Sequence, residues 1–160
     1  RKLKQVPDKY VRPTQAVIRK SILQILEPFT NLNVLDLYAG VGTLGIEALS
    51  RGANSLTMVE KNKFVFRVLK ENIRMIGVDS IVRLECKDVD FFLKNEKETY
   101  DIIFADPPYS ISNYEDLREK VKYLLNPEGL FCMEMKKTPI NNEGVRLKTF
   151  GNKQVAIWRK

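Results

Sequence analysis

The sequence predicts an α/β protein with a mostly parallel sheet, helices on both faces of that sheet and a carboxyl-terminal antiparallel hairpin. Three observations predict this fold class. Short apolar runs alternate with segments of helical periodicity, a glycine-rich loop joins the first run to the next helix, and only a turn separates the last two strand-like segments. With 160 residues, of which 44% are hydrophobic, the chain can bury one sizeable core.

The amino-terminal segment combines a basic arm with a helix. Residues 1–20 contain seven Lys or Arg and one Asp, a net charge of +6, so the other 140 residues carry only +1 of the total +7. Thr14 is the expected N-cap of a helix that runs through Glu27 and ends at Pro28. Its apolar residues recur at helical spacing, so residues 1–28 are expected to form an arm and helix packed on a main domain, residues 29–160.

The main domain is expected to alternate strands and helices. Strands are predicted at residues 34–38, 55–59, 81–86, 100–105 and 130–135, and helices at residues 43–51, 62–76, 89–93 and 114–125. Gly77 is the expected stop of the second of these helices. Residues 145–150 and 154–158 flank Gly151-Asn152-Lys153 and are predicted to form a hairpin that closes one edge of the sheet.

The composition excludes several classes of chemistry. The chain has no His, which removes His-based triads and the commonest zinc sites, so its chemistry must use carboxylates, amides, the backbone or a cofactor. Cys86 and Cys132 are far apart and support neither a disulfide framework nor a metal site, which favours a reducing, cytoplasmic environment. We expect no membrane span, because no apolar run is long enough, and no signal peptide, because the first residues lack the apolar stretch that one requires.

The glycine-rich loop predicts a nucleotide-containing ligand. Gly40, Gly42 and Gly45 have the spacing of a dinucleotide fingerprint, and Glu60 ends the second strand twenty residues after Gly40. Glycines let the backbone approach a ligand closely, and a carboxylate at the end of the second strand can bind both hydroxyls of a ribose. NAD, FAD and S-adenosylmethionine all present such a ribose. A tight turn without a ligand is the alternative.

Two acidic residues refine this prediction. Asp36 lies inside the first strand, where a buried carboxylate is costly unless something uses it. The ammonium group of S-adenosylmethionine could use it, whereas the pyrophosphate of NAD would be repelled, and a carboxylate bonded to loop amides is the alternative. Asp88 has two interpretations of equal weight, as an acceptor for an adenine amino group or as a helix N-cap.

The strongest functional signal is Asp106-Pro107-Pro108-Tyr109 at the carboxyl end of the fourth strand. In open α/β sheets, ligand and substrate meet beyond the carboxyl ends of the strands. Two prolines stiffen the loop, so that the Asp106 carboxylate and the Pro107 carbonyl can orient the lone pair of an exocyclic amine toward a methyl sulfonium. Tyr109 can stack on the base. The alternative is a rigid loop with a packed tyrosine.

These segments together resemble the RsmD family, the bacterial 16S ribosomal RNA guanine-N2 methyltransferases. The resemblance rests on residues 36–42 (DLYAGVG), residues 45–53 (GIEALSRGA), Glu60, residues 106–109, Arg12-Pro13-Thr14 with Arg19 downstream, and Phe150-Gly151-Asn152. It extends over residues 1–158. It implies a Rossmann-like S-adenosylmethionine-dependent methyltransferase fold, with the small ribosomal subunit or its assembly intermediate as substrate.

The resemblance also implies roles for individual residues, and the basic arm adds others. The expected catalytic residues are Asp106, Pro107, Pro108 and Tyr109. The expected S-adenosylmethionine-binding residues are Asp36, Tyr38, Gly40, Gly42, Thr43, Glu60, Lys61, Asp88 and Val89. The expected RNA-binding residues are Arg1, Lys2, Lys4, Lys9, Arg12 and Arg19, whose binding should weaken with salt unless the arm is merely a solvated tail. We expect a monomer without a metal site.

Three other functions remain compatible with the sequence. The Asp-Pro-Pro-Tyr element also occurs in DNA adenine-N6 and protein glutamine methyltransferases, so adenine N6 of RNA or DNA is an alternative acceptor. The glycine spacing permits an NAD-binding oxidoreductase, against which Asp36 and the absence of His argue. A non-catalytic RNA-binding module could use the basic arm alone.

Overall fold

The computed structural model describes residues 2–10, 16–108, 113–141 and 143–160. Its strands are β1 (Asn33–Leu37), β2 (Ser55–Val59), β3 (Val82–Glu85), β4 (Tyr100–Ala105), β5 (Leu125–Lys136), β6 (Val145–Phe150) and β7 (Lys153–Arg159). Its helices are α1 (Ala16–Leu26), α2 (Thr43–Ser50), α3 (Lys63–Ile76), α4 (Val89–Asn95) and α5 (Tyr114–Lys122), with a short 3-10 turn, η1 (Asp79–Ile81).

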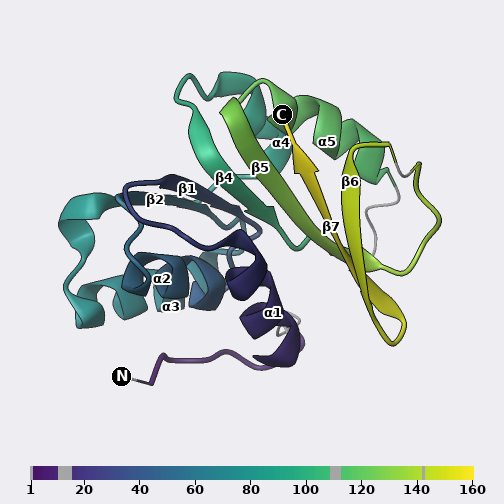
Figure 1. The fold of residues 1–160 in the computed structure, drawn as a ribbon. Helices are drawn as coiled ribbons and strands as arrows, with labels where there is room; N and C mark the ends of the chain where they lie inside the picture. The colour runs from purple at the N-terminus through teal and green to yellow at the C-terminus, as the bar shows by residue number, and fades with distance from the viewer. Residues whose placement is uncertain (1, 11–15, 109–112, 142) are drawn as a thin grey trace.

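One sheet joins all of these strands in the order β3-β2-β1-β4-β5-β7-β6 (Figure 1). The first five strands are parallel, whereas β7 runs antiparallel to β5 and pairs with β6 as a hairpin at the sheet edge. The predicted α/β class and the predicted hairpin are therefore confirmed. No helix in the described part of the chain combines the length and apolarity that crossing a membrane requires.

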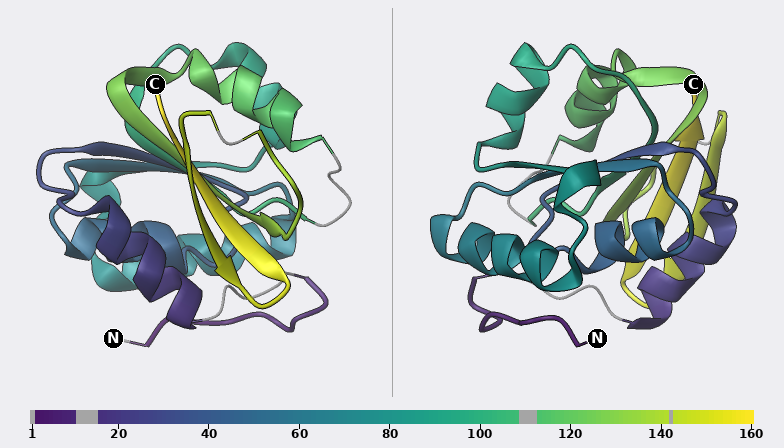
Figure 2. Two further views of the ribbon diagram at one scale, coloured as in Figure 1. Left: turned by 45° about the vertical axis from the view of Figure 1, so that its right-hand side comes forward. Right: turned by 90° about the vertical axis from the view of Figure 1, so that its left-hand side faces the viewer.

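Helices cover the two faces of the sheet in separate layers, as Figure 2 shows. Successive side chains of a strand point to opposite faces, so β1 contributes to two cores. Leu35 and Leu37 pack with residues of α4 and α5 on one face, and Val34 packs with residues of α1, α2 and α3 on the other. The short apolar run of β1 is thus buried on both sides, as in other parallel sheets.

Local capping residues fix the boundaries of α3. Asn62 is the N-cap, because its side chain accepts a hydrogen bond from the Val65 amide. Gly77 ends the helix with φ 78°, a left-handed conformation that glycine adopts readily. Val65, Leu69 and Ile73 recur at helical spacing and are buried. The helix is therefore confirmed at both ends. The expected cap of the first helix, Thr14, lies outside the described residues.

The boundary between α5 and β5 differs from the prediction. The helix ends at Lys122 rather than residue 125, and β5 begins at Leu125 rather than Leu130. Leu125 already pairs with Tyr100 of β4, and the register then shifts before Leu130 pairs with Ile102. Pro127 and Gly129 indicate a turn in the sequence, but here they lie within the irregular part of the paired strand.

The arm lies along the outer side of α3 (Figure 2). The Lys4 amide donates to Asn72 Oδ1 over 2.8 Å, and Asn72 Nδ2 donates back to the Lys4 carbonyl over 3.1 Å. Val6 is buried against Val41 and Val65. The first described residues are thus joined to the body by hydrogen bonds and by apolar contact.

Candidate cofactor and catalytic site

The parallel strands bring several polar residues together toward their carboxyl ends. Leu37 pairs with both Val59 and Ala105, and Ala105 pairs with Met133. The residues that follow these four strand positions therefore lie side by side in a terminal row, which consists of Glu60, Tyr38, Asp106 and Glu134. The strand order reverses between β1 and β4, the type of position where α/β sheets bind their ligands.

The glycine-rich loop lies directly against this row. Gly40 and Gly42 have φ values of 61° and 95°, so both occupy the left-handed region that favours glycine. A Cβ on Gly42 would stand 2.6 Å from the Leu69 Cδ1 atom of α3, so the Leu69 side chain would have to shift to admit one. Thr43 then begins α2 and is half-buried. The Gly40 amide donates to Glu60, so the backbone of the loop contacts the terminal row directly.

Glu60 is held by two backbone amides. Its Oε1 accepts a hydrogen bond from the Gly40 amide over 3.0 Å, and its Oε2 accepts one from the Asn62 amide over 2.8 Å. The residue is buried, whereas Lys61 beside it is exposed. A carboxylate has about four lone-pair sites, so each oxygen can accept a further hydrogen bond. The orientation and capacity of Glu60 therefore fit the two hydroxyls of a ribose.

Asp36 is an electrostatically costly residue. Its side chain is buried, with Oδ2 accepting a hydrogen bond from the Gly45 amide over 3.2 Å. Burial, together with the charges of Asp106 and Glu60, raises the pKa of Asp36 to about 8 despite that hydrogen bond. The hydrogen bond to Asp36 comes from a single amide in the first turn of α2, and it does not offset the free-energy cost of burying the carboxylate. A cationic ligand group would relieve this cost and thus fits the site.

Replacing Asp36 with Asn should make the cofactor-free protein more stable at high pH. The pKa of Asp36 is higher in the folded than in the unfolded state, so its contribution to the free energy of unfolding is most favourable below about pH 4. That contribution falls as the pH rises to about 8. The variant should therefore gain stability over the wild type across this range, on the order of a few kcal/mol. Denaturant unfolding at pH 5, 6.5 and 8 measures the difference in free energy of unfolding between the variant and the wild type. A difference that does not change with pH would contradict the raised pKa of Asp36.

Asp88 lies near Tyr38 of the terminal row, close enough for its charge to act on the Tyr38 phenol. Tyr38 is half-buried with φ 58°, and burial, followed by the charges of Asp90 and Asp88, raises the pKa of its phenol. Asp88 Oδ1 accepts a hydrogen bond from the Asp90 amide over 2.9 Å at the start of α4, which confirms the N-cap interpretation of Asp88. Its side chain is exposed, and Val89 after it is buried. The adenine role of Asp88 stays a prediction.

The Asp-Pro-Pro segment follows β4 directly. Asp106 is half-buried, Pro107 is buried and Pro108 is exposed, while Tyr109 lies outside the described residues. Asp106 is close enough to Asp36 for its charge to raise the pKa of that residue. The predicted catalytic carboxylate therefore shares one acidic site with Asp36 and Glu60, on either side of the β1–β4 switch point.

Glu134 is a site residue that the sequence prediction missed. It follows Met133 of β5 and is buried, with only 3% of its surface exposed. Its Oε1 pairs with Lys153 Nζ at 3.3 Å, and its Oε2 has no hydrogen-bond partner within the described structure. The signal was available, since Glu134 is the one acid in the apolar run of residues 130–135. An unsatisfied buried carboxylate oxygen is costly and is characteristic of functional sites.

The predicted RNA-binding residues divide into three groups. Lys2 and Lys9 are exposed, and Lys4 is exposed but paired with Glu71 at 2.8 Å. Arg19 is half-buried and its guanidinium binds Glu47 of α2 at 3.0 Å, so it joins α1 to α2. Arg1 and Arg12 lie outside the described residues.

The chain is similar to known methyltransferases in sequence and in structure. Over 141 residues it is 33% identical to Ribosomal RNA small subunit methyltransferase D from Buchnera aphidicola, an alignment that covers 86% of this chain and 73% of that protein. The solved structure of a putative methyltransferase from Escherichia coli superposes with a TM-score of 0.87 at 28% identity, covering 100% of this chain and 92% of the other.

A more distant structure shows the fold alone. A SAM-dependent methyltransferase from Agrobacterium tumefaciens superposes with a TM-score of 0.71 at 20% identity, covering 94% of this chain and 63% of that one. The family described as Conserved hypothetical protein 95 matches residues 1–159. The chain, with its glycine loop, terminal row and Asp-Pro-Pro segment, therefore belongs to this family, the RsmD family that its motifs resemble.

Proposed function

We propose that this protein transfers a methyl group from S-adenosylmethionine to the exocyclic N2 of a guanine in 16S ribosomal RNA. The observation that carries the proposal is the convergence of Glu60, the glycine-rich loop and Asp106 at the switch point of the sheet. Family membership supports the same reaction, because the Buchnera relative is a small-subunit ribosomal RNA methyltransferase.

The residues at the edge of the sheet fit S-adenosylmethionine. This cofactor, when bound, supplies an electrophilic methyl group on a cationic sulfonium. Glu60 would accept the ribose hydroxyls with the lone pairs that Gly40 and Asn62 leave open. The buried Asp36 would face the positive charge of the amino-acid end, which restores its ionised form. The glycines of the loop would let the ligand approach the backbone closely.

Asp106 would position and deprotonate the target amine. The lone pair of an exocyclic amino group on a base is delocalised into the ring, so the amine is a weak nucleophile. Asp106 and the Pro107 carbonyl would accept its two hydrogens and orient the nitrogen lone pair toward the methyl group. An Asp106 oxygen would take the proton that the nitrogen loses as the new C–N bond forms and the methyl–sulfur bond breaks, with the bonding electron pair left on sulfur. The prolines hold both acceptors in place.

The acceptor-rich row favours guanine over adenine as the target. Guanine presents two kinds of donor on one edge, the N1 hydrogen and the N2 hydrogens, whereas adenine presents an acceptor at N1 beside its amino group. Asp106 and Glu134 both offer carboxylate oxygens, and Oε2 of Glu134 has no partner among the described residues. Two neighbouring carboxylates match the guanine edge and would repel N1 of adenine.

The test is methyl transfer to defined substrates. Labelled S-adenosylmethionine is incubated with the protein and small ribosomal subunits that lack the modification, or with naked 16S RNA, and digested nucleosides are identified by mass. We expect N2-methylguanosine, with more label on the assembled particle than on naked RNA. N6-methyladenosine would overturn the guanine assignment. Failure to bind the cofactor in calorimetry would overturn the methyltransferase proposal itself.

A further inference from the structure

The outer side of α3 carries a row of basic residues. Lys63, Arg67, Lys70 and Arg74 are spaced by four, three and four positions and are all exposed. This spacing places them on one face, over about 16 Å of helix axis. None of the four makes an ion pair within 4.0 Å with another described residue. The sequence analysis did not identify this local excess of positive charge, because acidic residues elsewhere in the chain balance it in the total charge.

The arm adds to this face and neutralises its single acid. Glu71 is the only acidic residue of α3, and Lys4 binds it at 2.8 Å. The hydrogen bond from Lys4, followed by the charges of Arg67 and Arg74, holds the pKa of Glu71 below its usual value. Asn72 fixes Lys4 there through its two hydrogen bonds to the arm backbone. Two segments far apart in the chain therefore form one positive surface.

An aromatic pair lies at the end of this surface that is next to the site. The Tyr10 and Phe64 rings approach to 4.8 Å between centroids, and both residues are about two-fifths exposed, at 40% and 43%. Lys9 Nζ stands 5.1 Å from the Tyr10 ring centroid. Phe64 lies in the first turn of α3, four residues after Glu60. Exposed large aromatic side chains beside cations are typical of surfaces that bind unpaired nucleotides.

We propose that this arm–α3 surface, formed by Lys63, Arg67, Lys70, Arg74, Tyr10 and Phe64, binds single-stranded RNA next to the target nucleotide. The basic side chains would contact successive phosphates, and the aromatic pair would stack an unpaired base. The row of charges leads along α3 toward the edge of the sheet where Glu60 and Asp106 lie. This inference rests on the proposed function, because it assigns a binding surface to the same RNA substrate.

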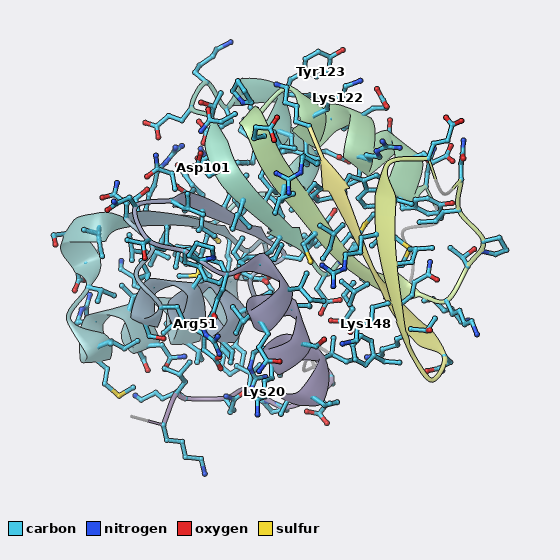
Figure 3. All side chains as sticks on the ribbon, viewed as in Figure 1. Lys20, Arg51, Asp101, Lys122, Tyr123 and Lys148 are labelled. Carbon is cyan, nitrogen blue, oxygen red and sulfur yellow. The ribbon has the colours of Figure 1, made fainter. Side chains whose placement is uncertain are left out.

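Charge neutralisation tests the phosphate contacts. The double variant Arg67→Gln/Lys70→Gln should bind a single-stranded 16S RNA fragment at least tenfold more weakly than the wild type, with a log–log salt slope smaller by about one to two. The matched control is Lys94→Gln/Lys122→Gln, which removes two exposed bases from α4 and α5 in the opposite layer (Figure 3 labels Lys122). Filter binding at four salt concentrations measures both variants.

A second variant tests the aromatic pair. Tyr10→Leu/Phe64→Leu keeps apolar contact and should weaken RNA binding about tenfold while leaving the salt slope unchanged, because no phosphate contact is lost. Calorimetry with S-adenosylmethionine should give wild-type affinity for every variant. Equal losses in the Lys94/Lys122 control, or wild-type RNA affinity in the α3 variant, would overturn this surface. If the RNA-binding surface is overturned but the wild type still methylates subunits, the proposed function stands. A wild type that transfers no methyl group would contradict the proposed function and, with it, the RNA-binding surface.

Discussion

Replacing Asp106 with Ala should abolish methyl transfer while leaving the affinity for S-adenosylmethionine nearly unchanged. The carboxylate is proposed to hold the target amine and take its proton, a role worth on the order of 10²–10⁴-fold in rate. It stands on the β4 side of the switch point, whereas the glycine-rich loop and Glu60 lie on the other side. Single-turnover transfer of labelled methyl to small subunits measures the rate, and calorimetry measures the cofactor affinity.

The variant Asp106→Asn serves as the control for shape. An amide keeps one oxygen acceptor but cannot take a proton, so it should bind RNA normally and still react far more slowly than the wild type. If Asp106→Ala loses cofactor binding and transfers methyl normally at saturating cofactor, the assigned role is wrong.

Replacing Glu60 with Gln should lower the affinity for S-adenosylmethionine by roughly 10- to 100-fold, as expected from the loss of charged hydrogen bonds of about 1.5–3 kcal/mol. Both oxygens of Glu60 accept from backbone amides, so the NH2 group of Gln must face either the Gly40 or the Asn62 amide, donor against donor. The substitution should therefore weaken both the hydrogen bonds that hold the loop and the contact with the ribose. Isothermal titration gives the dissociation constant.

The rate at saturating cofactor should fall much less than the affinity, because Glu60 has no proposed contact with the amine. Glu98→Gln, an exposed carboxylate outside the terminal row, is the matched control and should bind the cofactor as the wild type does. An unchanged dissociation constant for Glu60→Gln would remove Glu60 from the cofactor site.

Features encoded by neighbouring residues could be predicted from the sequence. The caps Asn62 and Gly77 act within a few residues of themselves, and the left-handed positions Gly40 and Gly42 follow from the requirements of a tight loop. Asp36 could be singled out because a charge inside an apolar strand is costly wherever that strand is buried. Gly40, Gly42 and Asp36 belong to the proposed cofactor site, and their placement needed only the strand–loop–helix pattern.

Features that depend on long-range pairing could not be predicted in the same way. Glu134 is a site residue only because the pairing register of β4 and β5 places it beside Asp106. The sequence alone does not fix that register. The contact between Lys4 and Asn72 joins residues 68 positions apart through one buried amide. The early start of β5 was not predicted because Pro127 and Gly129 are typical turn residues. In the structure they lie within the strand, between the paired residues Leu125 and Leu130.

The buried amide of Asn72 has a thermodynamic consequence. Besides holding the Lys4 backbone, its Nδ2 donates to the Val41 carbonyl over 3.0 Å, inside the glycine-rich loop. Displacing the arm would therefore change the surroundings of a side chain that also holds the glycine-rich loop. We expect a ligand that immobilises the arm to favour the ordered loop, and any such coupling between the two sites must be reciprocal.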